Sequence, residues 1–147
     1  MLFDSHAHIN EASYSPEERA ELIKTIEASD VDYVADIGYD LASSKLAVEH
    51  AAQYPWCYAV VGCHPHDAKS MDDMELAMYK GLARKKKVVA IGEIGLDFHY
   101  DHSPRDIQRE WFRRQIRLAN QLKMPIVIHS READQETMDI LKEEGAF

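Results

Sequence analysis

Five short runs of apolar and β-favouring residues recur along the chain, and a helical pattern follows each of them. The runs are Leu2 to His6, Tyr33 to Ile37, Cys57 to Cys63, Val88 to Glu93 and Ile126 to His129. Strands this uniformly apolar are typical of a sheet buried on both faces, and strict alternation of strand and helix is typical of parallel pairing. The sequence therefore predicts an α/β fold in which helices cover a parallel sheet.

Clear start signals accompany the helical segments. Ser15 is the expected N-cap of the first helix, with Pro16 at the first helical position and Glu18 completing a capping box. Further helices are expected over 41–53, from about Ser70 to Ala83, after Ser103-Pro104, and from about Glu132 to Lys142. The helix expected from about Ser70 to Ala83 is the third along the chain. It places four apolar side chains on one face, which predicts that they are buried: Met74, Ala77, Met78 and Leu82.

Composition limits the classes of function. With 46% apolar residues the chain can form a real core, and its formal charge of −9 argues against a broad basic groove for nucleic acid. A phosphate-containing substrate would then be held mainly by metal ions. Neither a signal peptide nor a membrane span is evident, and Cys57 and Cys63 do not form a disulfide framework, so we expect no membrane partner and a cytoplasmic location.

The histidines are distributed unevenly. Five lie at or just past predicted strand ends: His6, His8, His64, His66 and His129. His99 and His102 lie in the loop after the fourth strand, and His50 alone is on a predicted helix. The carboxyl ends of parallel strands meet at one end of such a fold. The distribution therefore predicts one polar site rather than several unrelated positions.

Four of the strand-end residues are candidate metal ligands. His6 and His8 alternate along a strand, so both imidazoles face the same way and can share a cation, although an isolated pair of this kind is weak evidence. Glu93 shares a predicted face with Val89 and Ile91, and an unpartnered carboxylate buried there would be costly. A solvated glutamate is the alternative. His129 is a natural ligand at the end of the fifth strand.

Three further residues are candidates for substrate binding. Arg131 shares a face with the preceding strand-end histidine and can hold an anionic group. His64 and His66 flank Pro65 after the third strand, and either substrate contact or orientation of a metal ligand fits them.

Several blocks in the right order resemble the TatD family of metal-dependent hydrolases. They are DSHAHIN at 4–10, GCHPH at 62–66, GEIGLDF at 92–98, SPRDIQREWFRRQIRLA at 103–119 and PIVIHSREA at 125–133. The likeness covers essentially the whole chain, and five collinear blocks are far more specific than one motif.

This resemblance implies a TIM (β/α)8 barrel, of which residues 1–147 supply the N-terminal portion, about five βα units of a single domain. It also implies a two-metal deoxyribonuclease that cleaves phosphodiester bonds in DNA or in a small phosphodiester, with Zn, Mn, Mg or Fe as the divalent ion. By this pattern His6 and His8 bind one metal, His129 binds the second, and Glu93 bridges both. The substrate pocket is then lined by His64, His66 and Arg131.

The family pattern also includes a later histidine and an aspartate that acts as the general base, and both are expected beyond Phe147. We therefore expect weak activity from this chain alone, unless a nearby titratable group such as Asp97, His99 or His102 substitutes. Five strands also leave the first and fifth as open edges. Either the natural protein continues, or self-association through the sheet edges covers them.

Other functions remain open at this point. The same architecture accommodates hydrolases of amides, lactones and other acyl substrates, because the fold does not fix the substrate. A partial barrel that binds metal without catalysis is a second alternative. Another phosphoesterase family whose chains open with Asp-x-His-x-His is a third, although the GEIGLDF block argues against it.

Overall fold

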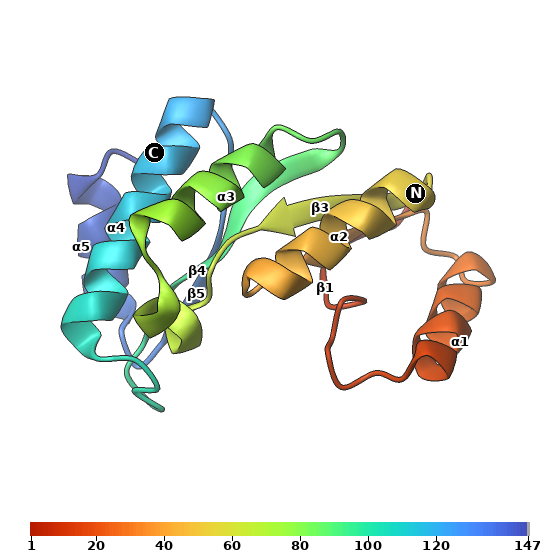
Figure 1. Ribbon diagram of the computed structural model, residues 1–147, viewed down its shortest axis with the longest axis horizontal. Helices are drawn as coiled ribbons and strands as arrows, with labels where there is room; N and C mark the ends of the chain where they lie inside the picture. Colours follow the sequence, from red (N-terminus) through yellow and green to blue (C-terminus); the bar gives the residue numbers. More distant parts are fainter. Residues whose placement is uncertain (147) are drawn as a thin grey trace.

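The computed structural model describes residues 1–146 and shows a single parallel sheet with its strands in sequence order (Figure 1). The expected α/β fold with five βα units is confirmed, and the sheet forms a half-barrel. Among residues 1–146, β1 pairs with β2 alone and β5 with β4 alone, so these two strands are the edges of the described sheet. The strands are β1 (Phe3–Ala7), β2 (Tyr33–Ile37), β3 (Cys57–Val61), β4 (Val88–Asp97) and β5 (Ile126–Arg131).

A helix follows each strand, and a short 3₁₀ helix, η1, precedes α3. The predicted capping box starts the first helix: Ser15 Oγ accepts from the backbone N of Glu18 at 3.1 Å, and the Glu18 carboxylate accepts from the backbone N of Ser15 at 3.3 Å. The helices are α1 (Pro16–Glu27), α2 (Leu41–Gln53), η1 (Pro65–Ser70), α3 (Asp73–Ala83), α4 (Arg105–Leu122) and α5 (Asp134–Glu143).

The main core lies between the sheet and the helices that cover it. Ile91, Ile94 and Leu96 of β4 belong to this core together with Phe112 and Ile116 of α4. The other face of the sheet has a smaller cluster, formed by Ala35, Ile37, Val60 and Ala90 with Val127 packed against it. The outer face is therefore sealed by helices, while the inner face is only partly filled.

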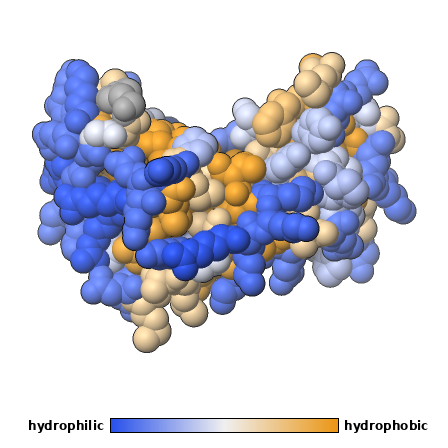
Figure 2. Space-filling model, turned by 90° about the horizontal axis from the view of Figure 1, so that it is seen from above, coloured by the Kyte–Doolittle hydropathy of each residue, from blue (hydrophilic) through white to orange (hydrophobic). Residues whose placement is uncertain are grey.

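The amino-terminal end of the inner face exposes apolar side chains. A cavity of about 320 Å³ there is lined by Met1, Phe3, Tyr33, Tyr58 and Val89. Figure 2 shows apolar surface along a hollow between two arms of the molecule. Within residues 1–146, no helix combines the length and apolar character that a bilayer span requires.

The predicted apolar face of the third helix is wrong for three of its four residues. Met74 is 74% exposed, Met78 is 44% exposed and Ala77 is exposed, whereas Leu82 packs against the main core beside the buried Tyr79 and Ala83. The helix begins at Asp73, because the Asp72 side chain caps it by accepting from the backbone N of Glu75 at 2.7 Å. Docking against the neighbouring elements, rather than the count of apolar side chains, selects the buried face.

The predicted alternation along the fourth strand is also wrong near its end. The pairing of β4 with β5 shifts register between Ile91 and Ile94. Because of this irregularity Ile91 packs in the main core while Glu93 lines the polar pocket at the carboxyl end of the strands. Glu93 therefore reaches the predicted site by a local break in the strand and not by simple alternation.

Candidate metal centre

The structure brings the predicted site residues together at the carboxyl ends of four strands. A pocket of about 320 Å³ lies at their centre. His6 lies on β1, His8 directly follows it, Glu93 is on β4, His129 and Arg131 are on β5, and His64 and His66 lie at the start of η1 after β3. The pocket is lined by His8, Glu11, Tyr39, His64, His66, Asp67 and Glu93.

The first group of ligand atoms comes from His6, His8 and Glu93, and these atoms lie within 4.8 Å of one another. His6 Nε2 is 3.6 Å from Glu93 Oε1, and His8 Nε2 is 3.9 Å from Glu93 Oε2. His8 Nδ1 donates to the backbone carbonyl of Ile37 at 2.8 Å. In the neutral ring that bond makes Nε2 of His8 the nitrogen available to a cation, which is how metal-binding histidines are commonly oriented.

The second group comes from His64, His66 and His129, whose ligand atoms also lie within 4.8 Å of one another. His129 Nδ1 lies 3.6 Å from Glu93 Oε1, so this histidine also adjoins the first group. The four predicted metal ligands are thus contiguous, with the Glu93 carboxylate in the middle. His64 and His66 lie against His129 rather than in a separate substrate region.

Asp97 organises the second group, a role that the sequence did not reveal. Its Oδ2 accepts hydrogen bonds from His66 Nε2 and His129 Nε2, each at 2.9 Å. Its Oδ1 accepts from the backbone N of His99 at 3.1 Å and of Tyr100 at 2.9 Å. Both histidines donate through Nε2, so in the neutral form of each ring Nδ1 is the nitrogen available to a metal.

These four donors occupy both oxygens of the Asp97 carboxylate. Burial opposes its ionisation, but the hydrogen bonds from Tyr100, His66 and His129 outweigh that cost and hold its pKa below the usual range. A buried carboxylate with a lowered pKa and occupied oxygens is a poor proton acceptor for a substrate. It therefore does not fit the substitute general base that the sequence suggested.

The charge states at the centre of the site favour a cation. Burial opposes ionisation of Glu93, yet the contact with His129 and the neighbouring His64 and His6 lower its pKa, so the carboxylate stays charged. Burial, together with His129 and His66 close by, lowers the pKa of His64 to about 3. The contact with Glu93 raises the pKa of His129, burial opposes this rise, and the hydrogen bond to Asp97 adds to it. A charged carboxylate beside imidazole groups is the kind of donor set that transition metals prefer.

Gly95 allows β4 and β5 to approach at this site. Its φ is +149°, and a Cβ built on it would lie 1.9 Å from the backbone oxygen of His129. No side chain fits there. The strand pairing that places Asp97 and Glu93 beside His129 therefore requires glycine at this position.

The one histidine predicted on a helix forms a buried pair. His50 Nδ1 lies 2.7 Å from Asp36 Oδ2, and both side chains are buried. Asp36 Oδ1 accepts from the backbone N of Asn10 at 3.2 Å, and Asn10 Nδ2 donates to the Ile37 carbonyl that also binds His8. This pair connects α2 to the end of β2 and, through Asn10, to the loop after β1. The same loop carries His8, so the pair helps to hold His8 in position.

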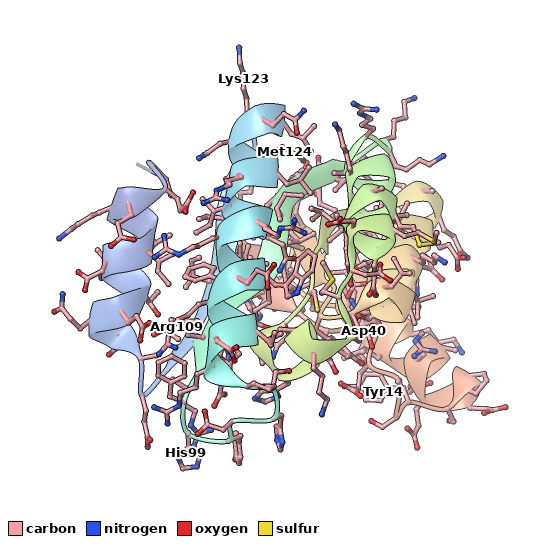
Figure 3. The ribbon with its side chains drawn as sticks, turned by 60° about the vertical axis from the view of Figure 1, so that its left-hand side comes forward. Tyr14, Asp40, His99, Arg109, Lys123 and Met124 are labelled. Atoms are coloured by element: carbon pink, nitrogen blue, oxygen red, sulfur yellow. The ribbon has the colours of Figure 1, made fainter. Side chains whose placement is uncertain are left out.

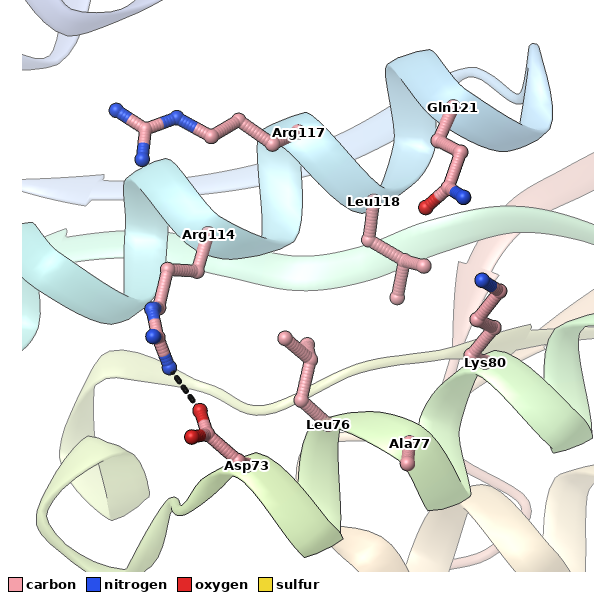
Figure 4. Close-up of a pocket in the computed structure, with 8 residues that line it drawn as sticks. All are labelled: Asp73, Leu76, Ala77, Lys80, Arg114, Arg117, Leu118 and Gln121. Atoms are coloured by element: carbon pink, nitrogen blue, oxygen red, sulfur yellow. Dashed lines mark hydrogen bonds and ion pairs between the residues drawn. The ribbon is translucent and has the colours of Figure 1, made fainter.

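Another hollow, of about 420 Å³, lies between α3 and α4 on the helical side (Figure 4). Asp73 and Arg114 form an ion pair across it, and Leu76 and Leu118 face each other. None of the candidate metal ligands lines it. The site loops lie elsewhere: Figure 3 shows His99 at one end of the molecule and Lys123, just after α4, at the other.

Comparisons with known proteins agree on one family. A family model described as TatD related DNase matches residues 3–147. The "Uncharacterized metal-dependent hydrolase YabD" of Bacillus subtilis is 46% identical over 146 residues, covering 99% of this chain and 57% of that protein. The "3'-5' ssDNA/RNA exonuclease TatD" of Cronobacter turicensis is 35% identical over 140 residues, covering 95% of this chain and 53% of that protein.

A solved structure shows the same fold. The crystal structure of YJJV, a TatD homologue from Escherichia coli, superposes with a TM-score of 0.85 at 28% identity and covers 97% of this chain and 56% of that chain. The chain thus spans about half the length of the curated relatives it matches.

Proposed function

The chain belongs to the family of TatD related DNases, and we propose that its strand-end site binds two divalent cations and forms the N-terminal part of a phosphodiester hydrolase. The observation that carries this proposal is the place of Glu93. Its carboxylate lies 3.6 Å from His6, 3.9 Å from His8 and 3.6 Å from His129, so one acidic group faces imidazoles from both sides.

The donor atoms fit two adjacent cations. His6, His8 and Glu93 would hold the first, and Glu93 with Nδ1 of His129 would hold the second. Mixed imidazole and carboxylate donors suit zinc, manganese or iron, and magnesium less well. Two cations bound there would polarise a phosphoryl oxygen, lower the pKa of a water molecule and stabilise the leaving oxygen.

The surrounding residues prepare the site for an anionic substrate. Asp97 holds the ring of His129 in the orientation that leaves Nδ1 free. Arg131 lies at the end of the same strand and offers a cationic group to a phosphate. The formal charge of −9 argues against strong long-range attraction of a polyanion by the chain itself. Bound cations would therefore provide most of the attraction.

A single- or double-stranded nucleic acid or a small phosphodiester fits this chemistry, and the relative named as an exonuclease for ssDNA and RNA favours a single strand. The proposed location is the cytoplasm, where a nucleic acid substrate would be met. Residues 1–147 form one part of a TIM-barrel domain in this proposal.

The test uses two colorimetric substrates and a metal analysis. We expect the purified chain to bind zinc or manganese and to cleave bis(p-nitrophenyl) phosphate slowly, and we expect chelation or Glu93→Gln to abolish both. Glu49→Gln, an exposed change on α2, is the matched control and should alter neither. Turnover of p-nitrophenyl acetate alone would indicate an acyl hydrolase. Metal binding without any turnover would indicate a non-catalytic role for this part of the protein.

A further inference from the structure

A small stack of planar groups lies at the rim of the site. The rings of Tyr100 and His102 are parallel within 5°, with their centroids 5.3 Å apart. The guanidinium carbon of Arg131 lies 4.9 Å from the centroid of the Tyr100 ring. Tyr100 is 50% exposed, and His102 and Arg131 are exposed as well. Three side chains from two separate segments thus form a partly exposed stack.

This stack adjoins the metal centre through one imidazole. His66 contacts the rings of both Tyr100 and His102 edge-on, with centroid distances of 5.7 and 4.7 Å. The same imidazole bonds Asp97 and lies 4.2 Å, centroid to centroid, from His64. Only the His66 side chain would therefore lie between a group bound on the stack and the candidate metal ligands.

Packing does not explain why these side chains are here. Over the described part of the chain, neither the Tyr100 hydroxyl, the His102 ring nor the Arg131 guanidinium has a hydrogen bond or an ion pair. The arginines of α4 behave differently, since Arg105, Arg109, Arg113 and Arg117 all pair with carboxylates. The stack keeps its polar atoms free.

The loop that carries the rings is held in place. The backbone N of Tyr100 donates to Asp97 Oδ1 at 2.9 Å. Ser103 Oγ donates to the carbonyl of His66 at 2.9 Å and accepts from the backbone N of Lys69 at 3.0 Å. A surface whose backbone is already fixed loses little conformational entropy when a ligand binds.

We propose that Tyr100 and His102 stack on the base of a nucleotide in a single-stranded nucleic acid while Arg131 binds its phosphate. This inference rests on the proposed function and deepens it by naming the side chains that would hold a base next to the metal centre. Aromatic side chains bind any base through its π-face, and only unpaired bases expose that face. When the guanidinium of Arg131 turns to the phosphate, it uncovers the Tyr100 ring for the base.

The test measures binding in the presence of a chelator, so it does not depend on hydrolysis. Fluorescence anisotropy compares a labelled pentathymidylate with an abasic phosphodiester oligomer of the same length. We expect the wild-type chain to bind the thymidylate about five-fold or more tightly, because stacking one base contributes on the order of 1–3 kcal/mol. Tyr100→Leu should remove this preference, and Tyr100→Phe should keep it.

Tyr33→Leu is the matched control, because Tyr33 is a part-exposed tyrosine at the amino end of β2, away from the site. It should leave the preference for bases unchanged. Equal affinity of the wild type for both oligomers, or no binding of either, overturns the stacking proposal even if phosphodiester turnover is found. A preference for bases without any phosphodiester turnover supports stacking and removes the proposed catalytic function instead.

Discussion

Asp97 Oδ2 lies 2.9 Å from Nε2 of His129, while Nδ1 of the same ring faces Glu93 at 3.6 Å. The aspartate therefore decides which nitrogen of the imidazole is free. We predict that Asp97→Asn weakens zinc binding about 10- to 100-fold, the usual effect of losing a residue that orients a metal ligand. Isothermal titration calorimetry with zinc measures this change.

The matched control for this change is Asp106→Asn, an exposed aspartate in the first turn of α4. It should leave the zinc affinity as it is in the wild type. An unchanged affinity in Asp97→Asn would show that the aspartate only supports the loop after β4.

The shared carboxylate predicts different metal contents for two variants. Glu93 adjoins both groups of imidazoles, whereas His6 adjoins only one. We therefore expect His6→Ala to retain about one zinc per chain and Glu93→Ala to retain essentially none after dialysis. Elemental analysis of the dialysed proteins measures the ratio. Equal zinc loss in the two variants would contradict separate sites.

Glycine at position 95 should be essential for folding. A Cβ at Gly95 would collide with the His129 backbone, and the positive φ adds strain, so Gly95→Ala should cost more than about 4 kcal/mol of unfolding free energy. In Gly81→Ala the new methyl group meets open space on α3, and the helix should gain roughly 0.5–1 kcal/mol. Urea unfolding of both variants compares them, and a mild effect at position 95 would mean that the strands can separate without loss of the fold.

The buried pair of Asp36 and His50 should contribute strongly to stability. Removing one partner leaves a buried polar group without its hydrogen bond, so His50→Ala should cost about 3–5 kcal/mol. His99→Ala removes an exposed pairing with Glu132 and should cost less than about 1 kcal/mol. Similar costs in urea unfolding would show that the buried pair is no more than a surface contact in its effect.

Acid should weaken the attachment of α5 to α4. The guanidinium groups of Arg117 and Arg113 hold the pKa of Glu144 below its usual range. A carboxyl group with a lowered folded-state pKa stabilises the fold above its unfolded-state pKa, and this stabilisation is lost as the pH falls through the folded-state value. The stability difference between wild type and Glu144→Gln should thus be largest near neutral pH and disappear in acid. A difference that persists at low pH would point to packing instead.

The sequence predicted the features that depend on local patterns. The alternation of strands and helices, the capping box at Ser15 and the gathering of strand-end histidines are all present in the structure. Each follows from a signal within a few residues or from the geometry shared by all parallel sheets.

The features that were missed depend on partners far apart in the chain. Asp97 receives its two imidazoles from 31 and 32 residues away, and Asp36 meets His50 across 14 residues. The buried face of α3 depends on how this helix packs against its neighbours, and the position of Glu93 depends on the register between β4 and β5. A short stretch of sequence shows neither. Local preference loses to tertiary contacts at such positions.

A single carboxylate between two sets of imidazoles also means that the two proposed cations would not bind independently. The second ion would be affected by any change that the first ion causes in the orientation or charge of Glu93. Thermodynamic linkage then requires that each ion change the affinity of the other by the same factor. Occupancy would therefore follow a cooperative or anticooperative titration curve, in which the affinity for one ion depends on whether the other is bound.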